Sequence, residues 1–465
     1  MSAVPAASCA VSPPATVSFG QALRFWFKLG FISFGGPAGH IAIMHRELVE
    51  QKRWISERRF LHALNYCMLL PGPEAQQLAT YIGWLMHRTW GGVVAGALFV
   101  LPSLFILIAL SWVYVAFGQV SWVAGLFYGI KPAVAAIVLQ AVWRIGSRTL
   151  RSPRQVPLLW AITLFSFIAI AWLKLPFPWV VLGAAITGVL GARYLPTQFA
   201  PVAGHGQGDA AASGADRQRF LIDDGTPAPA HARFRKSRLA AVLGVGALLW
   251  LLPMAALLAA QGWHGALSQM AWFFTKAALL TFGGAYAVLP YVYQGAVEQF
   301  QWLTGPQMID GLALGETTPG PLIMVVAFVG FVGGWTRQVL GPDLLFTGAA
   351  LAATIVTWFT FLPSFLFILA GGPLVESTHG NLKFTAPLTA ITAAVVGVIA
   401  SLALFFLVHI AWRRGAAAGG AMVDWMALAI ATGAAVALLR YKAGVIPVIA
   451  ACAVAGLIAR LSGWA

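Results

Sequence analysis

Two short motifs rich in glycine and proline occur twice in the chain. Ser33-Phe34-Gly35-Gly36 and Pro71-Gly72-Pro73 lie in the first half, and Thr281-Phe282-Gly283-Gly284 and Pro319-Gly320-Pro321 lie in the second. One ungapped shift of 248 residues (281 minus 33) superposes both pairs, together with Lys28 on Lys276. Glycine and proline interrupt helices. The repeated motifs therefore predict two copies of one unit, each with two broken helices.

Broken helices of this kind can bind an anion. A helix start offers free backbone N–H groups and the positive end of the helix dipole, and glycines let an oxyanion approach them. Serine and threonine hydroxyls can add hydrogen bonds. We predict a substrate site at Ser33, Gly35, Gly36, Pro71, Gly72, Pro73, Thr281, Gly283, Gly284, Thr317, Thr318, Pro319, Gly320 and Pro321. The alternative is that the glycines only allow close helix packing.

Two lysines and two glutamates stand beside these motifs in apolar context. Lys28 and Lys276 precede the Phe-Gly-Gly motifs and are predicted to hold a dianion between them. The alternative interpretation is that each lysine side chain extends to the membrane interface and binds no substrate. Glu74 follows the first Pro-Gly-Pro and Glu316 precedes the second, so both are candidates for proton coupling, because ionisable residues inside a membrane are usually functional. Glu74 could instead simply cap its helix.

Metal and cofactor sites are not predicted. The histidines at 40, 45, 62 and 87 show no metal spacing on one helical face, and the three cysteines are far apart. No glycine-rich nucleotide loop ending in Gly-Lys-Ser/Thr is present. We therefore expect no cofactor, and a chain that is not an enzyme.

Composition places these motifs in a membrane protein. Of 465 residues 60% are hydrophobic and 9% charged, whereas soluble domains carry about 25% charged residues. The net charge of +15 comes from a few short loops, so nucleic-acid binding is not expected. Thirteen hydrophobic segments, all predicted to be helical, lie near 20–45, 60–86, 90–117, 121–145, 156–174, 177–194, 238–260, 268–293, 306–334, 343–371, 384–412, 421–440 and 444–462.

Five regions follow from these segments. They are an N-terminal tail (1–18), a first transporter repeat (19–194), a flexible cytoplasmic linker (195–237), a connecting transmembrane helix (238–260) and a second repeat (261–465). Segments 46–59, 144–154 and 217–238 hold five, four and six basic residues. All three are cytoplasmic by the positive-inside rule if segment 60–86, like 20–45, is a re-entrant hairpin. The connecting helix then makes the copies inverted-topology repeats.

The motifs resemble a known family. Residues 31–40, 54–56 and 69–76, with 280–286 and 316–321 in the second half, are similar to the chromate ion transporter family in its long, two-domain form. The resemblance covers nearly the whole chain. It implies chromate efflux and chromate resistance, driven by the membrane potential or a proton gradient, in the bacterial cytoplasmic (inner) membrane. It leaves open whether the partner is chromate or sulfate and whether the protein is a homodimer.

Three other functions stay open at this stage. Sulfate or other oxyanion uptake by proton symport is the main alternative, since sulfate and chromate are similar tetrahedral dianions. A membrane enzyme acting on a lipid phosphate would need clustered acidic residues, and the acids here are scattered. A channel would not need coupling carboxylates. Efflux is favoured electrically, because each negative charge leaving through 100 mV gains about 2.3 kcal/mol.

Overall fold

The computed structural model describes residues 17–34, 36–118, 120–195, 198–199, 220–223, 229–282, 284–377, 385–414 and 421–462. Gly35, Gly283, most of the predicted tail and most of the predicted linker lie outside these ranges. The described part of the chain contains sixteen α-helices. Six of them (α4, α5, α7, α8, α13 and α14) are long and apolar enough to cross a membrane. The prediction of an all-helical, multi-spanning membrane protein is confirmed.

The first repeat contains seven helices. They are α1 (Phe19–Ile32), α2 (Gly36–His45), α3 (Glu57–Leu69), α4 (Glu74–Phe117), α5 (Ser121–Thr149), α6 (Pro157–Ala171) and α7 (Phe177–Tyr194), with a π-helical turn η1 (Arg46–Gln51) after α2. Ser56 accepts a hydrogen bond from the Arg59 backbone nitrogen and caps α3. At His87 and Arg88 the backbone of α4 leaves helical geometry, so its two arms (74–86 and 89–117) form a hairpin.

The second repeat follows the connecting helix α8 (Lys236–Gln261) and has the same order of elements, with two helices, α12 and α13, in the place of the two arms of α4. It contains α9 (Ala266–Leu280), α10 (Ala285–Tyr293), α11 (Gly305–Thr317), α12 (Val325–Thr336), α13 (Leu345–Ser377), α14 (Thr385–Ala411), α15 (Trp425–Leu439) and α16 (Val445–Leu461), with a π-helical turn η3 (Gln294–Gln299) after α10. Thr304 accepts a hydrogen bond from the Gln307 backbone nitrogen and caps α11. Short 3-10 turns lie at η2 (Ala230–Ala232), η4 (Leu322–Met324) and η5 (Pro342–Leu344).

Four of the thirteen predicted segments are broken. The segment at 20–45 divides into α1 and α2, 268–293 into α9 and α10, and 306–334 into α11 and α12. The segment at 60–86 divides into α3 and the first arm of α4, and α4 also contains the segment at 90–117, so the described chain has sixteen helices. Each break coincides with a Phe-Gly-Gly or Pro-Gly-Pro motif. The sequence also predicted helices alone, whereas β1 (Trp412–Arg414) pairs with β2 (Ala421–Val423) between α14 and α15. This three-residue pairing lies in the connection between two helices, and the fold class is all-helical as predicted.

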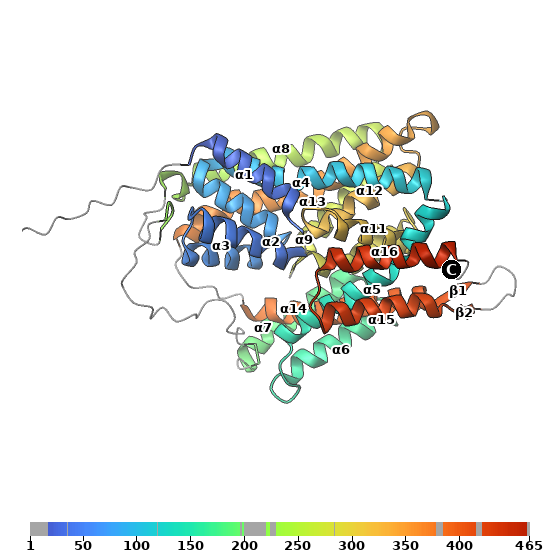
Figure 1. The fold of residues 1–465 in the computed structure, drawn as a ribbon. Helices are drawn as coiled ribbons and strands as arrows, with labels where there is room; N and C mark the ends of the chain where they lie inside the picture. Colours follow the sequence, from blue (N-terminus) through green and yellow to red (C-terminus); the bar gives the residue numbers. More distant parts are fainter. Residues whose placement is uncertain are drawn as a thin grey trace, which may run out of the picture.

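The two repeats exchange their last two helices. Helices α15 and α16 pack against α5 of the first repeat, and α6 and α7 pack against α14 of the second. Helices α5 and α14 pack against each other, as do α4 and α13. Helix α8 lies along one side of the molecule (Figure 1), and little of it is buried. The reciprocal packing is consistent with inverted repeats, which remain a prediction.

The described ends of the predicted linker contact the first repeat. The Ile222 backbone nitrogen donates to the Trp54 carbonyl oxygen, and the Ile222 carbonyl oxygen accepts from the Ser56 nitrogen, both at 3.0 Å. The His231 imidazole contacts the Trp84 carbonyl oxygen at 2.9 Å. These contacts place residues 220–223 beside the basic loop that precedes α3, and η2 beside α4.

Candidate functional site

The broken helices of the two repeats meet at one place. The Gly72 N–H donates to the Thr281 carbonyl oxygen, and the Gly320 N–H donates to the Ser33 carbonyl oxygen, both at 2.7 Å. Each Pro-Gly-Pro motif thus pairs with the Phe-Gly-Gly motif of the other repeat. This region, the described residues of 33–36, 71–73, 281–284 and 319–321, is referred to below as the crossing. The structure brings together all four predicted motifs.

Only glycine fits at the centre of each Pro-Gly-Pro motif. Gly72 and Gly320 have φ angles of +127° and +107°, which other residues rarely adopt. A Cβ atom on Gly72 would overlap Ser364 Oγ, and one on Gly320 would lie 2.8 Å from Ser103 Cβ. The glycines therefore permit a close approach between repeats as well as a turn. Both readings of the glycines, helix breaking and close packing, apply at this point.

The predicted hydroxyl donors are already engaged. Ser33 Oγ donates to the Leu29 carbonyl oxygen and Thr281 Oγ1 to that of Ala277, both at 2.7 Å. Thr317 and Thr318 donate in the same way to carbonyl oxygens of α11. The amides of Gly72 and Gly320 are likewise used within the crossing. These groups build the crossing, and an anion there needs other donors.

Polar groups that the sequence analysis did not select supply such donors. Ser103 Oγ and Ser364 Oγ are fully buried and have no hydrogen-bond partner among the described residues. Each adjoins the central glycine of the other repeat's Pro-Gly-Pro motif. The Gln76 and Gln77 side chains, in the first turn of α4, are not such donors, because their amide nitrogens donate to Thr80 Oγ1 and to the Pro71 carbonyl oxygen. The signal for the serines was the repeated Leu-Pro-Ser at 101–103 and 362–364.

Both predicted glutamates lie at the crossing. Glu316, at the end of α11, is buried and accepts a 2.5 Å hydrogen bond from the Tyr286 hydroxyl. Glu74, the first residue of α4, has its Oε1 atom beside Gly284. The Arg144 guanidinium interacts electrostatically with both carboxyls and lies 5.9 Å from the centre of the Tyr286 ring. We refer to Glu74, Arg144, Tyr286 and Glu316 as the central charge cluster.

Arg144 was missed because of its neighbours in sequence. It was counted with Arg148, Arg151 and Arg154 as part of a cytoplasmic loop, but α5 continues to Thr149. Arg144 therefore lies inside the helix, facing the second repeat, while Arg148 is exposed. Its position within an apolar run was the available signal, because a charge at membrane depth usually has a partner.

The two predicted lysines lie apart from this cluster. The Lys28 side chain is 64% exposed, and its Nζ atom is 3.9 Å from Glu47 Oε1. The Lys276 Nζ atom lies 5.8 Å from the ring centre of Trp272, an exposed residue of α9. Their described contacts give no support to the interpretation that the pair encloses a dianion.

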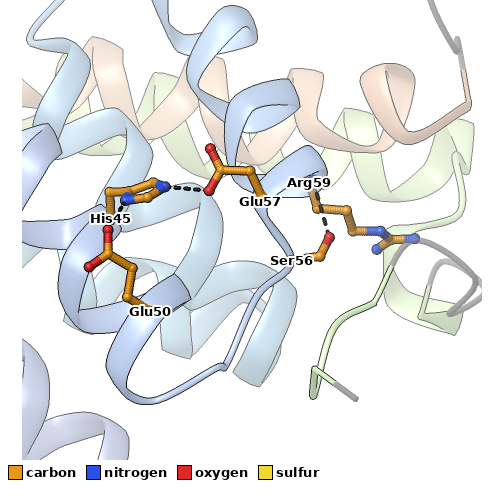
Figure 2. Close-up of polar contacts among 5 residues, drawn as sticks. All are labelled: His45, Glu50, Ser56, Glu57 and Arg59. Atoms are coloured by element: carbon orange, nitrogen blue, oxygen red, sulfur yellow. Dashed lines mark hydrogen bonds and ion pairs between the residues drawn. The ribbon is translucent and has the colours of Figure 1, made fainter. Parts of the chain in front are cut away.

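A polar cluster connects the end of α2 to the start of α3. The His45 imidazole lies between Glu50, at 3.1 Å, and Glu57, the first residue of α3. Figure 2 shows both carboxylates directed at the ring, with the Ser56–Arg59 cap beside them. No group of three or more histidine, cysteine, aspartate or glutamate side chains in the described ranges has the geometry to hold a metal ion.

Comparison with known proteins gives one consistent result. The sequence model described as "Chromate transporter" matches residues 20–189 and 268–457, one match for each repeat. The chain is 30% identical to a probable chromate transport protein of Synechococcus elongatus over 385 residues, 82% of this chain and 83% of that protein. It is 31% identical to the chromate transport protein of Cupriavidus metallidurans (83% and 81% covered) and 33% identical to that of Pseudomonas aeruginosa (84% and 81%). No solved structure shows significant similarity.

Proposed function

This chain belongs to the chromate transporter family, whose members are transport proteins and not enzymes, and we propose that it exports chromate across the bacterial cytoplasmic membrane. The observation that supports this proposal best is the crossing, where both repeats present broken helices, buried hydroxyls and one guanidinium at a single place. Irregular backbone at membrane depth is tolerated only where it is buried in protein or lines a water-filled cavity. Such paired breaks mark transport sites.

In this proposal a tetrahedral dianion binds at the crossing. Arg144 supplies the compensating charge, and Ser103 and Ser364 donate hydrogen bonds from opposite sides. Helix α4 and the turn η4 both begin at the crossing, and the positive end of the α4 dipole faces it. The donors come from both repeats, so a movement of the short hairpins that carry the broken helices would open the site to one face at a time.

The membrane potential can drive this export. A dianion that leaves an inside-negative cell gains about 4.6 kcal/mol per 100 mV, twice the value for one charge. Neither ATP nor a cofactor is needed for that step. The basic loops between α2 and α3, after α5 and before α8 define the cytoplasmic face in this proposal, following the positive-inside rule.

One observation favours a second function, which is oxyanion uptake by proton symport. Arg144 faces two carboxyls at the crossing, Glu74 and Glu316. A proton on either carboxyl frees the guanidinium to pair with an anion, so proton and anion binding support each other. Thermodynamic linkage of this sign moves both solutes in the same direction. An inward proton gradient would then drive uptake of sulfate or chromate.

Radiolabelled chromate flux separates the two functions. In inside-out vesicles, potential-driven export gives accumulation when the vesicle interior is made positive, without a pH gradient. Symport gives accumulation in right-side-out vesicles under an inward proton gradient, and Glu316→Gln abolishes that gradient dependence. Lys28→Ala and Lys276→Ala are the controls, since both lysines lie outside the central charge cluster. Absence of chromate accumulation under either gradient contradicts both functions.

A further inference from the structure

A polar cavity lies at the end of the helices where α5 begins. Its volume is about 480 Å³, within the range of small-molecule sites. The walls come from the end of α4, the first turns of α5 and α11, and the last turns of α12 and α16. Its polar lining includes Tyr114, Tyr128, Lys131, Gln307, Asp310 and Arg460. None of these six residues belongs to the crossing.

A buried ion pair forms one wall of this cavity. Lys131 Nζ lies 3.3 Å from Asp310 Oδ2, and the Tyr114 hydroxyl donates to the same oxygen at 2.9 Å. The Asp310 side chain is 4% exposed, whereas that of Lys131 is 32% exposed. The other oxygen of Asp310, Oδ1, is buried without a hydrogen-bond partner among the described residues. The carboxylate is thus held inside the wall, and the ammonium group reaches the cavity.

The charges of the lining favour an anion. Lys131 and Arg460 carry two positive charges against one negative charge on Asp310. Tyr128 faces the cavity too, and its hydroxyl donates to Asp424 at 2.7 Å. An ammonium group has three donors, so Lys131 can keep its contact with Asp310 and still bind an oxyanion.

The position of the cavity relates it to the crossing. Helix α5 begins at the cavity and ends near Arg148, and its 29 residues span about 43 Å. The cavity is therefore at the opposite end of the helix from the basic loop after α5. Asp310 and Glu316 lie on the same short helix, α11, about 9 Å apart along its axis. One helix connects the cavity wall to the central charge cluster.

We propose that this cavity is a second, peripheral binding site for the transported oxyanion, with Lys131 as its ligand and Asp310 as the residue that positions Lys131. The inference rests on the proposed transport function. The site lies on the face opposite the basic loops, and an exported anion reaches it after the crossing. The pair with Asp310 weakens binding there, which suits a release site.

A purely structural ion pair is the competing explanation, and a double variant distinguishes the two. Removing one partner leaves a buried charge unpaired, whereas removing both is often nearly neutral for stability. Lys131→Met with Asp310→Asn should therefore restore the wild-type fold in either case. Only a ligand role leaves the double variant with weakened anion binding at the cavity face. Lys131→Arg, which keeps the charge, should retain binding.

The test is chromate exchange measured separately at each face, with right-side-out and inside-out vesicles. We expect Lys131→Met, alone and in the double variant, to raise the apparent KM at the cavity face about tenfold, the effect of losing one charge-assisted contact. The KM at the face with the basic loops should not change. Lys174→Met is the matched control, because Lys174 pairs with Glu298 outside the cavity.

Three outcomes would overturn the inference. These are a wild-type KM at both faces in the double variant, an equal rise at both faces, or an effect that appears only in liposomes containing phosphatidylglycerol and not in phosphatidylcholine alone. The last result would assign the cavity to a lipid headgroup. Failure of the proposed function itself would look different, because the wild-type protein would then show no chromate exchange at either face.

Discussion

The guanidinium of Arg144 lies among Glu74, Tyr286 and Glu316, which come from three different helices. Glu74 and Glu316 could be selected from the sequence because they adjoin repeated motifs. Arg144 has no such neighbour, and a basic residue near a helix end looks like part of a loop. The hydroxyls of Ser33 and Thr281 were predicted as ligands, yet each donates its hydrogen bond to a carbonyl oxygen in the preceding helical turn.

Replacing Arg144 by methionine should lower chromate flux at least tenfold. The variant loses the charge that balances the anion and leaves the Glu74 and Glu316 carboxyls without the cation that both interact with, which a low-dielectric site penalises. Arg144→Lys should recover part of the flux. Arg148→Met, one turn further along α5 and exposed, is the control and should transport like the wild type. Normal flux in Arg144→Met would remove Arg144 from the proposed site.

The unpartnered serines give a second test. Ser103→Ala and Ser364→Ala should weaken chromate binding several-fold without lowering thermal stability, because each removes a buried hydroxyl that has no described partner. Ser111→Ala is the matched control, since Ser111 is equally buried and unpartnered in the described chain and lies on α4 two turns beyond Ser103. If all three variants bind chromate alike, the serines at the crossing have no role as ligands.

At the scale of elements, the sequence located the helix breaks but not their pairing. Glycine and proline act on the local backbone, so their positions predict where α1, α3, α9 and α11 must end. Which broken end meets which depends on contacts between residues about 210 to 290 positions apart (281 minus 72, and 320 minus 33). No local pattern encodes that pairing. The repeated motifs indicate only that the broken ends of the two copies should make equivalent contacts.

Alanine at Gly72 or Gly320 should disrupt the crossing. Each substitution forces a left-handed backbone on a residue with a Cβ atom, which costs about 1–3 kcal/mol, and adds an overlap with the opposite repeat. We expect a lower unfolding temperature and loss of chromate flux in both variants. Gly244→Ala in α8 is the control, because its Cβ would meet nothing within 4 Å. Equal unfolding temperatures for Gly72→Ala and Gly244→Ala would contradict the close packing of the crossing.

At the scale of the whole molecule, the sequence predicted two copies but not how they share helices. The sequence divides the copies at 19–194 and 261–465 and does not indicate which helices pack together. In the structure α5 is covered by α15 and α16, and α14 by α6 and α7. Close contacts such as Gly129 of α5 with Cys452 of α16 require small residues on facing helices, and that match is visible only in three dimensions.

This exchange predicts that neither half is stable alone. A chain cut between residues 209 and 210, in the predicted linker, should yield fragments that co-purify when expressed together and transport chromate. Either fragment expressed by itself should be degraded or aggregate. In the first fragment α5 would lose its contacts with α15 and α16, and in the second α14 would lose its contacts with α6 and α7. Size-exclusion chromatography of tagged fragments measures both outcomes. A monodisperse single half would show that the exchanged contacts contribute little.

The sharing of terminal helices also limits how the protein can move. Helices α5, α15 and α16 form one bundle, and α14, α6 and α7 form another, so each bundle contains chain from both repeats. A rocking motion that treated residues 19–194 and 261–461 as two rigid bodies would shear both bundles at once. The mobile parts of a transport cycle must therefore be the short hairpins, sliding against a frame that the two repeats build jointly.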